Sequence, residues 1–365
     1  MTAPSYFQTG NPFMDIVYTL FNGISEVPLI TAPLAGLLIL TGVTVASRKA
    51  GFMMFISGLI GALVAYILGA SAGNITFGLF GYNSILTGMA FWSGPFVKSN
   101  KATFLLSIIG AAVTAVTWQA MSHVMGDVMG GYGLGYAIPG FTSSFILTTW
   151  VIMWASKRYG YDIWPDPGTG HPVEPISPGG KEPEFHWTAW EFVKASLKGV
   201  SQVTFVENWV TGVFWVVGLT LAFELSPVSG HVWTNGYTTG WNSNSPLFLA
   251  GVMAWLGSAI GLALGIACKL PIGELRGGIH GFNQVLVMIA LTSFLPLTWV
   301  SFGFAILATV ACSLFTMPAL QRFFGNWGLP ALTGPFVFTA WIFLLAVSGF
   351  GQVPAGIGWA RPPGT

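Results

Sequence analysis

The nine residues 78–86, GLFGYNSIL, return two hundred positions later as GIHGFNQVL at residues 278–286. Both copies begin with glycine, place an asparagine five residues later and end on leucine. Two other pairs accompany them: Gly23-Ile-Ser-Glu-Val with Gly199-Val-Ser-Gln-Val, and Thr-x-x-Phe-x-x-Thr-x-Trp at 142–150 and again at 333–341. The three pairs follow the same order along the chain. The sequence therefore indicates an internal duplication.

The sequence around these motifs is strongly apolar. Of the 365 residues, 53% are hydrophobic and 7% are charged, and the net charge is +1. Residues 51–97, 225–268 and 277–321 contain no Asp, Glu, Lys or Arg, and each run exceeds the roughly 20 residues that cross a bilayer core. Water-soluble domains carry roughly 25% charged residues, and disordered chains require low hydrophobicity. The composition predicts a polytopic membrane protein, and the absence of a basic surplus argues against nucleic acid as a partner.

The apolar segments fall into two groups of five, and their length favours helices over the short alternating strands of a membrane barrel. They lie at about 28–47, 51–72, 74–95, 102–120 and 133–155, and at about 206–225, 246–268, 277–296, 297–320 and 328–350. Clustered Pro, Gly and charge separate the groups, which is typical of an aqueous linker. We therefore divide the chain into a first membrane repeat (1–156), a linker (157–187), a second membrane repeat (188–350) and a C-terminal tail (351–365). The polar stretch 226–245 is expected to be an aqueous loop.

An odd number of crossings in each half would insert the two copies in opposite orientations. Inverted repeats of this kind usually hold a solute site near the membrane midplane, at their interface. The predicted fold class is thus an all-α polytopic membrane protein whose two inverted repeats surround one central pathway.

Few ionisable groups lie inside the apolar segments, although ion and proton pathways usually carry them at membrane depth. The repeated motifs instead offer hydroxyl, amide and aromatic groups. Removing water from an amide-like group without replacement costs roughly 2–7 kcal/mol, so such groups would have to replace the hydration of a passing solute. This inventory predicts a pathway for a small, neutral, polar solute. Cys268 and Cys312 lie in apolar stretches, where they are expected to be buried thiols, and no metal-ligand spacing is present. We predict neither a metal nor a cofactor, and no enzymatic activity.

The motifs as a set resemble the urea transporter family. The resemblance rests on Lys198-Gly-Val-Ser-Gln-Val-Thr-Phe-Val-Glu-Asn and its first-half counterpart, on Gly78-Leu-Phe-Gly-Tyr-Asn, and on Leu329-Pro-Ala-Leu-Thr-Gly-Pro-Phe. It covers residues 20–350 apart from the linker. It implies a homotrimer of the plasma membrane in which every protomer has its own pore, with about five crossings and one re-entrant half-helix from each half. Urea would pass edge-on and passively through a flat slot, between apolar faces and rows of oxygen acceptors.

The resemblance also implies roles for ten residues, carried over motif by motif. Glu26 and Gln202 would be acceptors at the two ends of the slot, with Leu29 and Phe205 flanking them. Tyr82 with Leu86, and Phe282 with Leu286, would form the apolar walls. Thr142 and Thr333 would face each other at the narrow centre.

Several alternatives stay open at this stage. His280 and Glu26 favour an ammonium or ammonia channel, and Ser144, which stands where the second half has Pro335, weakens the choice of urea over a related small amide. A membrane scaffold or sensor acting through its linker is a third hypothesis. Asn83 and Asn283 are expected to bond across helices rather than to touch solute.

The membrane orientation is also open. Basic residues follow the odd-numbered apolar segments, at Arg48, Lys49, Lys98, Lys101, Lys157 and Arg158. The positive-inside rule would make their face cytoplasmic, whereas the resemblance implies cytoplasmic termini and an external linker.

Overall fold

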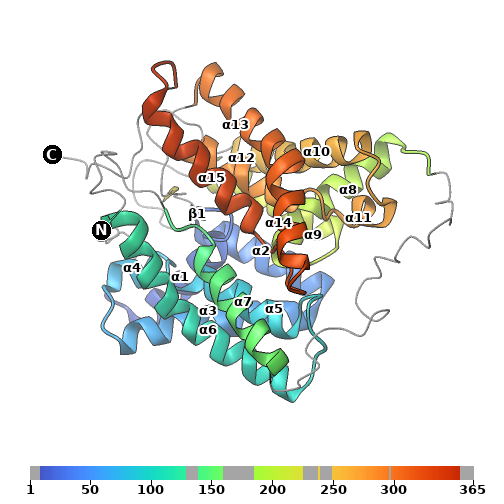
Figure 1. Ribbon diagram of the computed structural model, residues 1–365. Helices are drawn as coiled ribbons and strands as arrows, with labels where there is room; N and C mark the ends of the chain where they lie inside the picture. The colour runs from blue at the N-terminus through green and yellow to red at the C-terminus, as the bar shows by residue number, and fades with distance from the viewer. Residues whose placement is uncertain are drawn as a thin grey trace.

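The computed structural model describes residues 9–128, 139–158, 185–224, 237–238, 249–295 and 297–353. Helices make up most of these residues, and the first-half helices α1–α7 recur in the same order as α8–α13 and α15 in the second half (Figure 1). The first half contains α1 (Pro12–Ser25), β1 (Ile30–Thr31), α2 (Pro33–Ala46), α3 (Arg48–Ile67), α4 (Ala72–Thr76), α5 (Gly81–Trp92), α6 (Lys101–Ser122) and α7 (Ser143–Arg158). The second half contains α8 (Ala189–Ser201), α9 (Trp209–Glu224), β2 (Tyr237–Thr238), α10 (Leu249–Ala267), α11 (Ile272–Gly277), α12 (Phe282–Phe294), α13 (Trp299–Ala311), α14 (Met317–Gly325) and α15 (Gly334–Ala346).

Short irregular helices extend four of these elements. A π-helical turn, His123–Val128, continues α6, and another, Cys312–Thr316, joins α13 to α14. A 3-10 turn, Gln202–Thr204, follows α8, and Val347–Gly349 follows α15.

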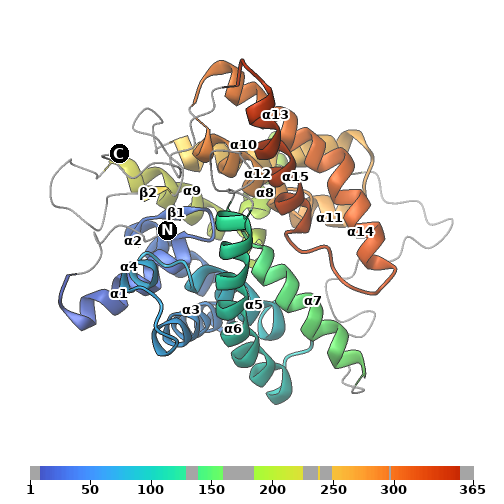
Figure 2. The same ribbon diagram turned by 60° about the vertical axis from the view of Figure 1, so that its left-hand side comes forward.

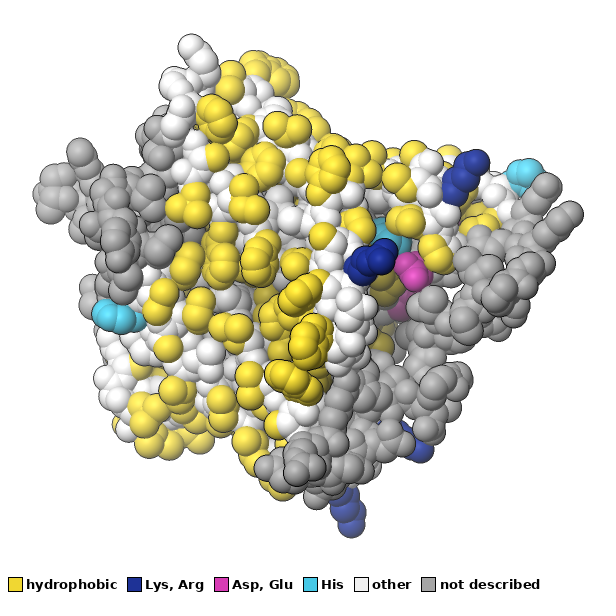
Figure 3. Space-filling view, in the orientation of Figure 1, with side chains coloured by type: hydrophobic (Ala, Val, Ile, Leu, Met, Phe, Trp, Pro, Cys, Tyr) yellow, Lys and Arg dark blue, Asp and Glu magenta, His cyan; other side chains and the backbone are white. Residues whose placement is uncertain are grey.

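Four helical stretches of the described chain are long and apolar enough to cross a bilayer: 48–67, 101–125, 249–267 and 299–325. A fifth candidate is α8 with α9, which together bend by 77° at the break between them. The helices α2, α7, α12 and α15 are apolar but shorter. Yellow side chains cover much of the surface in Figure 3, as expected where the environment is hydrocarbon rather than water. The prediction of an all-α polytopic membrane protein is confirmed.

Two amphipathic helices, α1 and α8, were absent from the predicted apolar segments. Their start signals are nevertheless present in the sequence. Asn11 accepts hydrogen bonds from the first turn of α1 and is followed by proline at the first helical position, while Thr188 accepts from the backbone of Glu191 in α8. A search for apolar runs alone overlooks them, because polar or charged residues interrupt the apolar ones in each helix.

In each half, the motif that begins at Gly23 or Gly199 contacts the motif that begins at Gly78 or Gly278. Gly78 and Gly278 have φ of 95° and 80°, a backbone conformation that glycine adopts without strain. A Cβ added at Gly78 would overlap the backbone of Gly23, and one at Gly278 would overlap Gly199. Close backbone approach between the end of α1 or α8 and the turn before α5 or α12 therefore explains why both motifs carry glycine.

The two halves meet along α2 and α9 and along α7 and α15, as both ribbon views show (Figures 1 and 2). Thr211 of α9 donates a hydrogen bond to the carbonyl of Gly42 in α2 at 2.8 Å. In addition, a tryptophan in the terminal helix of each half donates a hydrogen bond to the segment that precedes the terminal helix of the other half. The Trp150 indole N–H donates to the Pro330 carbonyl at 2.8 Å, and that of Trp341 to the Pro139 carbonyl at 3.0 Å.

One feature was not predicted. Strand β1 pairs antiparallel with β2, with Ile30 opposite Thr238 and Thr31 opposite Tyr237. Most of the predicted loop 226–245 and of the predicted linker 157–187 lies outside the described residues.

Candidate functional site

The hydroxyl oxygens of Thr142 and Thr333 lie 2.7 Å apart, and both side chains are fully buried. Each threonine immediately precedes the terminal helix of its half, α7 or α15. The third repeated motif therefore brings two residues that are 191 positions apart into contact at the boundary between the halves. The resemblance noted above implied that these two threonines face each other, and the structure brings their hydroxyls into contact.

Asn83 and Asn283 brace the start of these two helices in the same way. The Asn83 amide donates to the Phe141 carbonyl at 3.1 Å and accepts from the Phe145 N–H at 3.3 Å. Asn283 donates to the Leu332 carbonyl at 3.3 Å and accepts from the Phe336 N–H at 3.0 Å. Both asparagines bond across helices, as expected from the sequence, and so hold each threonine in position.

We expect Asn283→Ala to destabilise the protein by about 2–4 kcal/mol, because two buried backbone groups would lose this partner at about 1–3 kcal/mol each. Thermal unfolding in detergent measures the effect. Asn326→Ala, on an exposed residue, is the matched control and should shift the free energy of unfolding by less than about 0.5 kcal/mol. Equal melting temperatures for the two variants would contradict the bracing role.

Left-handed backbone is concentrated at this site. Leu29 and Phe205 occupy equivalent positions with φ of 64° and 58°, and Phe141 and Leu332, the residues before the two threonines, have φ of 49° and 52°. Such conformations cost a non-glycine residue of order 1–3 kcal/mol and cluster at functional sites. Leu29 and Phe205 were among the predicted site residues, whereas Phe141 and Leu332 were not.

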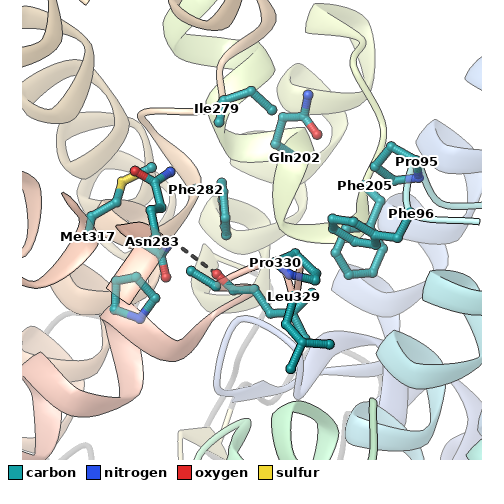
Figure 4. Close-up of a pocket in the computed structure, with 14 residues that line it drawn as sticks. Pro95, Phe96, Gln202, Phe205, Ile279, Phe282, Asn283, Met317, Leu329 and Pro330 are labelled. Carbon is teal, nitrogen blue, oxygen red and sulfur yellow. Dashed lines mark hydrogen bonds between the residues drawn. The ribbon is translucent and has the colours of Figure 1, made fainter. Parts of the chain in front are cut away.

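A pocket of about 230 Å³ lies in the second half, lined by Leu332 and Pro335 on either side of Thr333 in sequence but by neither central threonine. Gln202, Phe205 and Phe282, three of the predicted residues, line it, and Figure 4 shows Phe282 on one side and Phe205 with Phe96 on the other. The Gln202 amide donates to the Gly277 carbonyl at 2.8 Å, which leaves its side-chain oxygen as an acceptor. The remaining lining residues are Pro95, Phe96, Ile279, Asn283, Met317, Gln321, Leu329, Pro330, Ala331, Leu332 and Pro335. The pocket is thus mainly apolar, with a few amide and carbonyl groups.

First-half residues Pro95 and Phe96 belong to this pocket but were missed from sequence. The rings of Phe96 and Phe205 meet edge to face, with 5.3 Å between centroids. These residues follow α5 and lie outside the repeated motifs, so the duplication gave no signal for them.

The predicted site residues of the first half are packed more closely than those that line the second-half pocket. Leu29 and Tyr82 are 4% and 5% exposed, and the carboxylate of Glu26 accepts a hydrogen bond from Thr31, with Glu26 only 2% exposed. The structure buries Glu26 more deeply than the predicted end of a slot implies, because Thr31 belongs to strand β1, which pairs with β2 of the other half. The Tyr82 hydroxyl donates to the Phe141 carbonyl at 2.7 Å and accepts from the Trp118 indole at 3.0 Å.

The predicted wall residues Leu86 and Leu286 are fully buried. They lie one helical turn beyond Tyr82 and Phe282 respectively, on α5 and α12. The structure therefore puts each of them beside its predicted partner, but neither leucine lines the second-half pocket.

Charged groups gather at the second-half end. Lys198 and Glu207 form an ion pair at 2.8 Å, and the ring nitrogen Nε2 of His280 lies 2.8 Å from the carboxylate of Glu274. In Figure 3 blue, magenta and cyan side chains meet in one place, next to a surface that is mostly yellow and white. Phe80 stands at the position equivalent to His280, so the two halves do not form a histidine pair. Among the described residues no group of His, Cys, Asp and Glu side chains could hold a metal ion.

Apolar helices around a buried contact between two hydroxyls define a polytopic membrane protein whose centre is polar but uncharged. The family described as "Urea transporter" matches residues 2–157, 129–242 and 242–348. The chain belongs to the urea transporter family, which is a family of membrane transporters and not of enzymes.

Individual relatives agree with the family match. The chain is 27% identical over 342 residues to proteins named "Urea transporter 1" from Capra hircus, Ovis aries and Mus musculus. Each match covers 91% of this chain and 77% of the relative.

Proposed function

We propose that the protein is a passive, channel-like transporter of urea in the plasma membrane, and that urea crosses between the halves through the contact of Thr142 with Thr333. The observation that carries the proposal is this contact: two symmetric, fully buried hydroxyls with aromatic and aliphatic side chains on both sides. A flat diamide needs acceptors at its edges and apolar groups at its faces. Hydroxyl, amide and carbonyl oxygens replace lost water there, at a position where an unreplaced amide would cost roughly 2–7 kcal/mol.

The architecture we propose is a pair of inverted repeats, 1–156 and 188–350, on either side of the 157–187 linker. The recurrence of α1–α7 in the same order as α8–α13 and α15 supports the duplication, and the meeting of α7 with α15 at the threonine pair supports a pathway between the halves. In this arrangement Gln202, Phe205, Phe282 and Leu286 form the second-half site. Glu26, Leu29, Tyr82 and Leu86 form the first-half site.

We further propose that three copies of the chain assemble, each with its own pore. The resemblance to the family supports this proposal, and its test is the oligomer mass in detergent, measured by light scattering with correction for bound detergent. A single-chain mass that conducts urea would refute the trimer without affecting the channel.

An ammonium channel is less well supported. A pair of histidines facing the pathway would suit that function, but the side chain of His280 is occupied by Glu274 and its counterpart is Phe80. Urea is thus the solute that the site favours.

Reconstituted proteoliposomes test the function by stopped-flow light scattering. We expect urea permeability well above that of empty liposomes, with no urea-dependent current across a planar bilayer. Permeability equal to that of empty liposomes, from protein that is folded and inserted, would refute the proposal.

A further inference from the structure

We propose that Ser144 is a specificity-determining residue of the first-half site, where its hydroxyl donates a hydrogen bond to the carbonyl oxygen of the solute. This inference rests on the proposed function. It adds a hydrogen-bond donor to a pathway that otherwise offers mainly acceptors.

The position of Ser144 follows from the duplication. Thr142-Ser143-Ser144-Phe145 corresponds to Thr333-Gly334-Pro335-Phe336, and the asparagine braces act on the same two positions of each segment. Ser144 therefore stands where the second half has Pro335, which lines the pocket beside Gln202, Phe205 and Phe282. If the two halves correspond in structure as they do in sequence, the side chain of Ser144 faces the proposed solute site of the first half, as Pro335 faces the pocket of the second.

The hydroxyl of Ser144 is buried and has no hydrogen-bond partner within the described chain, at a residue exposure of 1%. A serine in the first turn of a helix usually satisfies its hydroxyl on a nearby backbone group. An unsatisfied buried hydroxyl is costly, so it indicates a partner that is present only part of the time. A passing solute is such a partner.

The chemistry of a diamide identifies the group that this hydroxyl would bind. Urea offers N–H donors at its edges and one carbonyl oxygen, and hydroxyl and amide oxygens of the pathway can accept the N–H groups. Pro335 has neither an N–H nor a hydroxyl, so the second half supplies no donor at this position. The hydroxyl of Ser144 supplies a donor there. The sulfur of a thiocarbonyl group is a weaker hydrogen-bond acceptor than the oxygen of a carbonyl group. The first-half site should therefore discriminate a carbonyl from a thiocarbonyl.

Ser143 is the matched control for this assignment. Its hydroxyl is also buried and without a partner in the described chain, at 3% exposure. Its counterpart is Gly334, where an added Cβ would face Leu320 and Trp150 rather than the pocket. The two neighbouring serines are thus both buried and both carry an unpaired hydroxyl in the described chain, but by this correspondence only Ser144 is directed at the proposed solute site.

The experiment compares the urea, thiourea and acetamide permeabilities of proteoliposomes that contain the wild type, Ser144→Ala, Ser144→Thr or Ser143→Ala. We expect Ser144→Ala to lower the ratio of urea to thiourea permeability about fivefold, the effect of one neutral hydrogen bond. The ratio of urea to acetamide should stay constant, since both solutes keep the carbonyl. Ser144→Thr, which retains a hydroxyl, and Ser143→Ala should keep the wild-type ratios.

The results of this experiment separate the assignment of Ser144 from the proposed function. An unchanged urea to thiourea ratio in Ser144→Ala, or an equal fall in Ser143→Ala, would overturn the assignment while wild-type urea flux still supports the channel. If Ser144→Ala does not fold, Ser144→Pro replaces it, because the second half tolerates proline there, and the same fivefold fall is expected. Wild-type flux no greater than that of empty liposomes would instead refute the proposed function itself.

Discussion

Replacing either central threonine by valine should lower urea permeability by about 5- to 150-fold. Valine keeps the shape of Thr142 or Thr333 but removes the hydroxyl, and the loss of a buried hydrogen-bond partner costs about 1–3 kcal/mol, which corresponds to that range of rates. The loss acts where urea would be least hydrated. Stopped-flow light scattering on proteoliposomes with equal protein content measures it.

The double variant separates a role in transport from a role in stability. Each single variant leaves one buried hydroxyl without the partner that it has in the wild type at 2.7 Å. Replacing both partners by apolar groups of the same shape is nearly neutral for folding. We therefore expect the Thr142→Val, Thr333→Val protein to unfold at a temperature close to that of the wild type but to conduct urea least of all.

Thr309→Val is the control for this series, because Thr309 is also fully buried but its hydroxyl donates to the Ala305 carbonyl within its own helix, α13. Its urea permeability should equal that of the wild type. Wild-type flux in the double variant would eliminate the threonine pair from the pathway.

The second large effect is on folding. We expect Gly36→Ala and Gly212→Ala each to destabilise the protein by about 3 kcal/mol or more, the upper end of the range for overpacking. A Cβ added at Gly36 would overlap the carbonyl oxygen of Phe21, and one at Gly212 that of Leu197. Both clashes are with backbone, so no side-chain rotation relieves them, and α1 would have to move away from α2, or α8 from α9.

The amount of protein that remains monodisperse after heating in detergent reports this loss. Gly303→Ala is the matched control: it lies in α13, where an added Cβ meets no atom within 4 Å. There alanine should be neutral or should stabilise by up to about 1 kcal/mol through its better helix propensity. Similar heat resistance in Gly36→Ala and Gly303→Ala would show that the close contact of α1 with α2 can be relaxed.

The parts of the fold that follow from hydrophobicity could be predicted from the sequence. Each of the ten predicted apolar segments contains described helix. The meeting of Thr142 with Thr333 was implied by the family resemblance, which the duplicated motifs carried onto these two positions. The periodic apolar run and the repeat are properties of the chain itself, so no tertiary information was needed.

The helices α1 and α8 carry polar residues among their apolar ones and escaped a search for apolar runs, although their capping residues could have indicated them. The rest depends on contacts between distant segments. Thr31, the partner of the buried Glu26, lies in β1, which pairs with β2 some two hundred residues away. Phe96 reaches the second-half pocket from the first half, and the left-handed backbone at Phe141 and Leu332 is imposed by the surrounding structure. These last features leave no local sequence signal.

The exchange of tryptophan hydrogen bonds between the halves has a consequence for biosynthesis. The indole of Trp150 bonds to Pro330, which is made 180 residues later, and ribosomes add about 5–20 residues per second. The nascent N-terminal helices must therefore wait about 10–40 seconds before the acceptor for Trp150 has been synthesised. A chain released early would keep that indole without its acceptor inside the bilayer, which would mark truncated products for quality control.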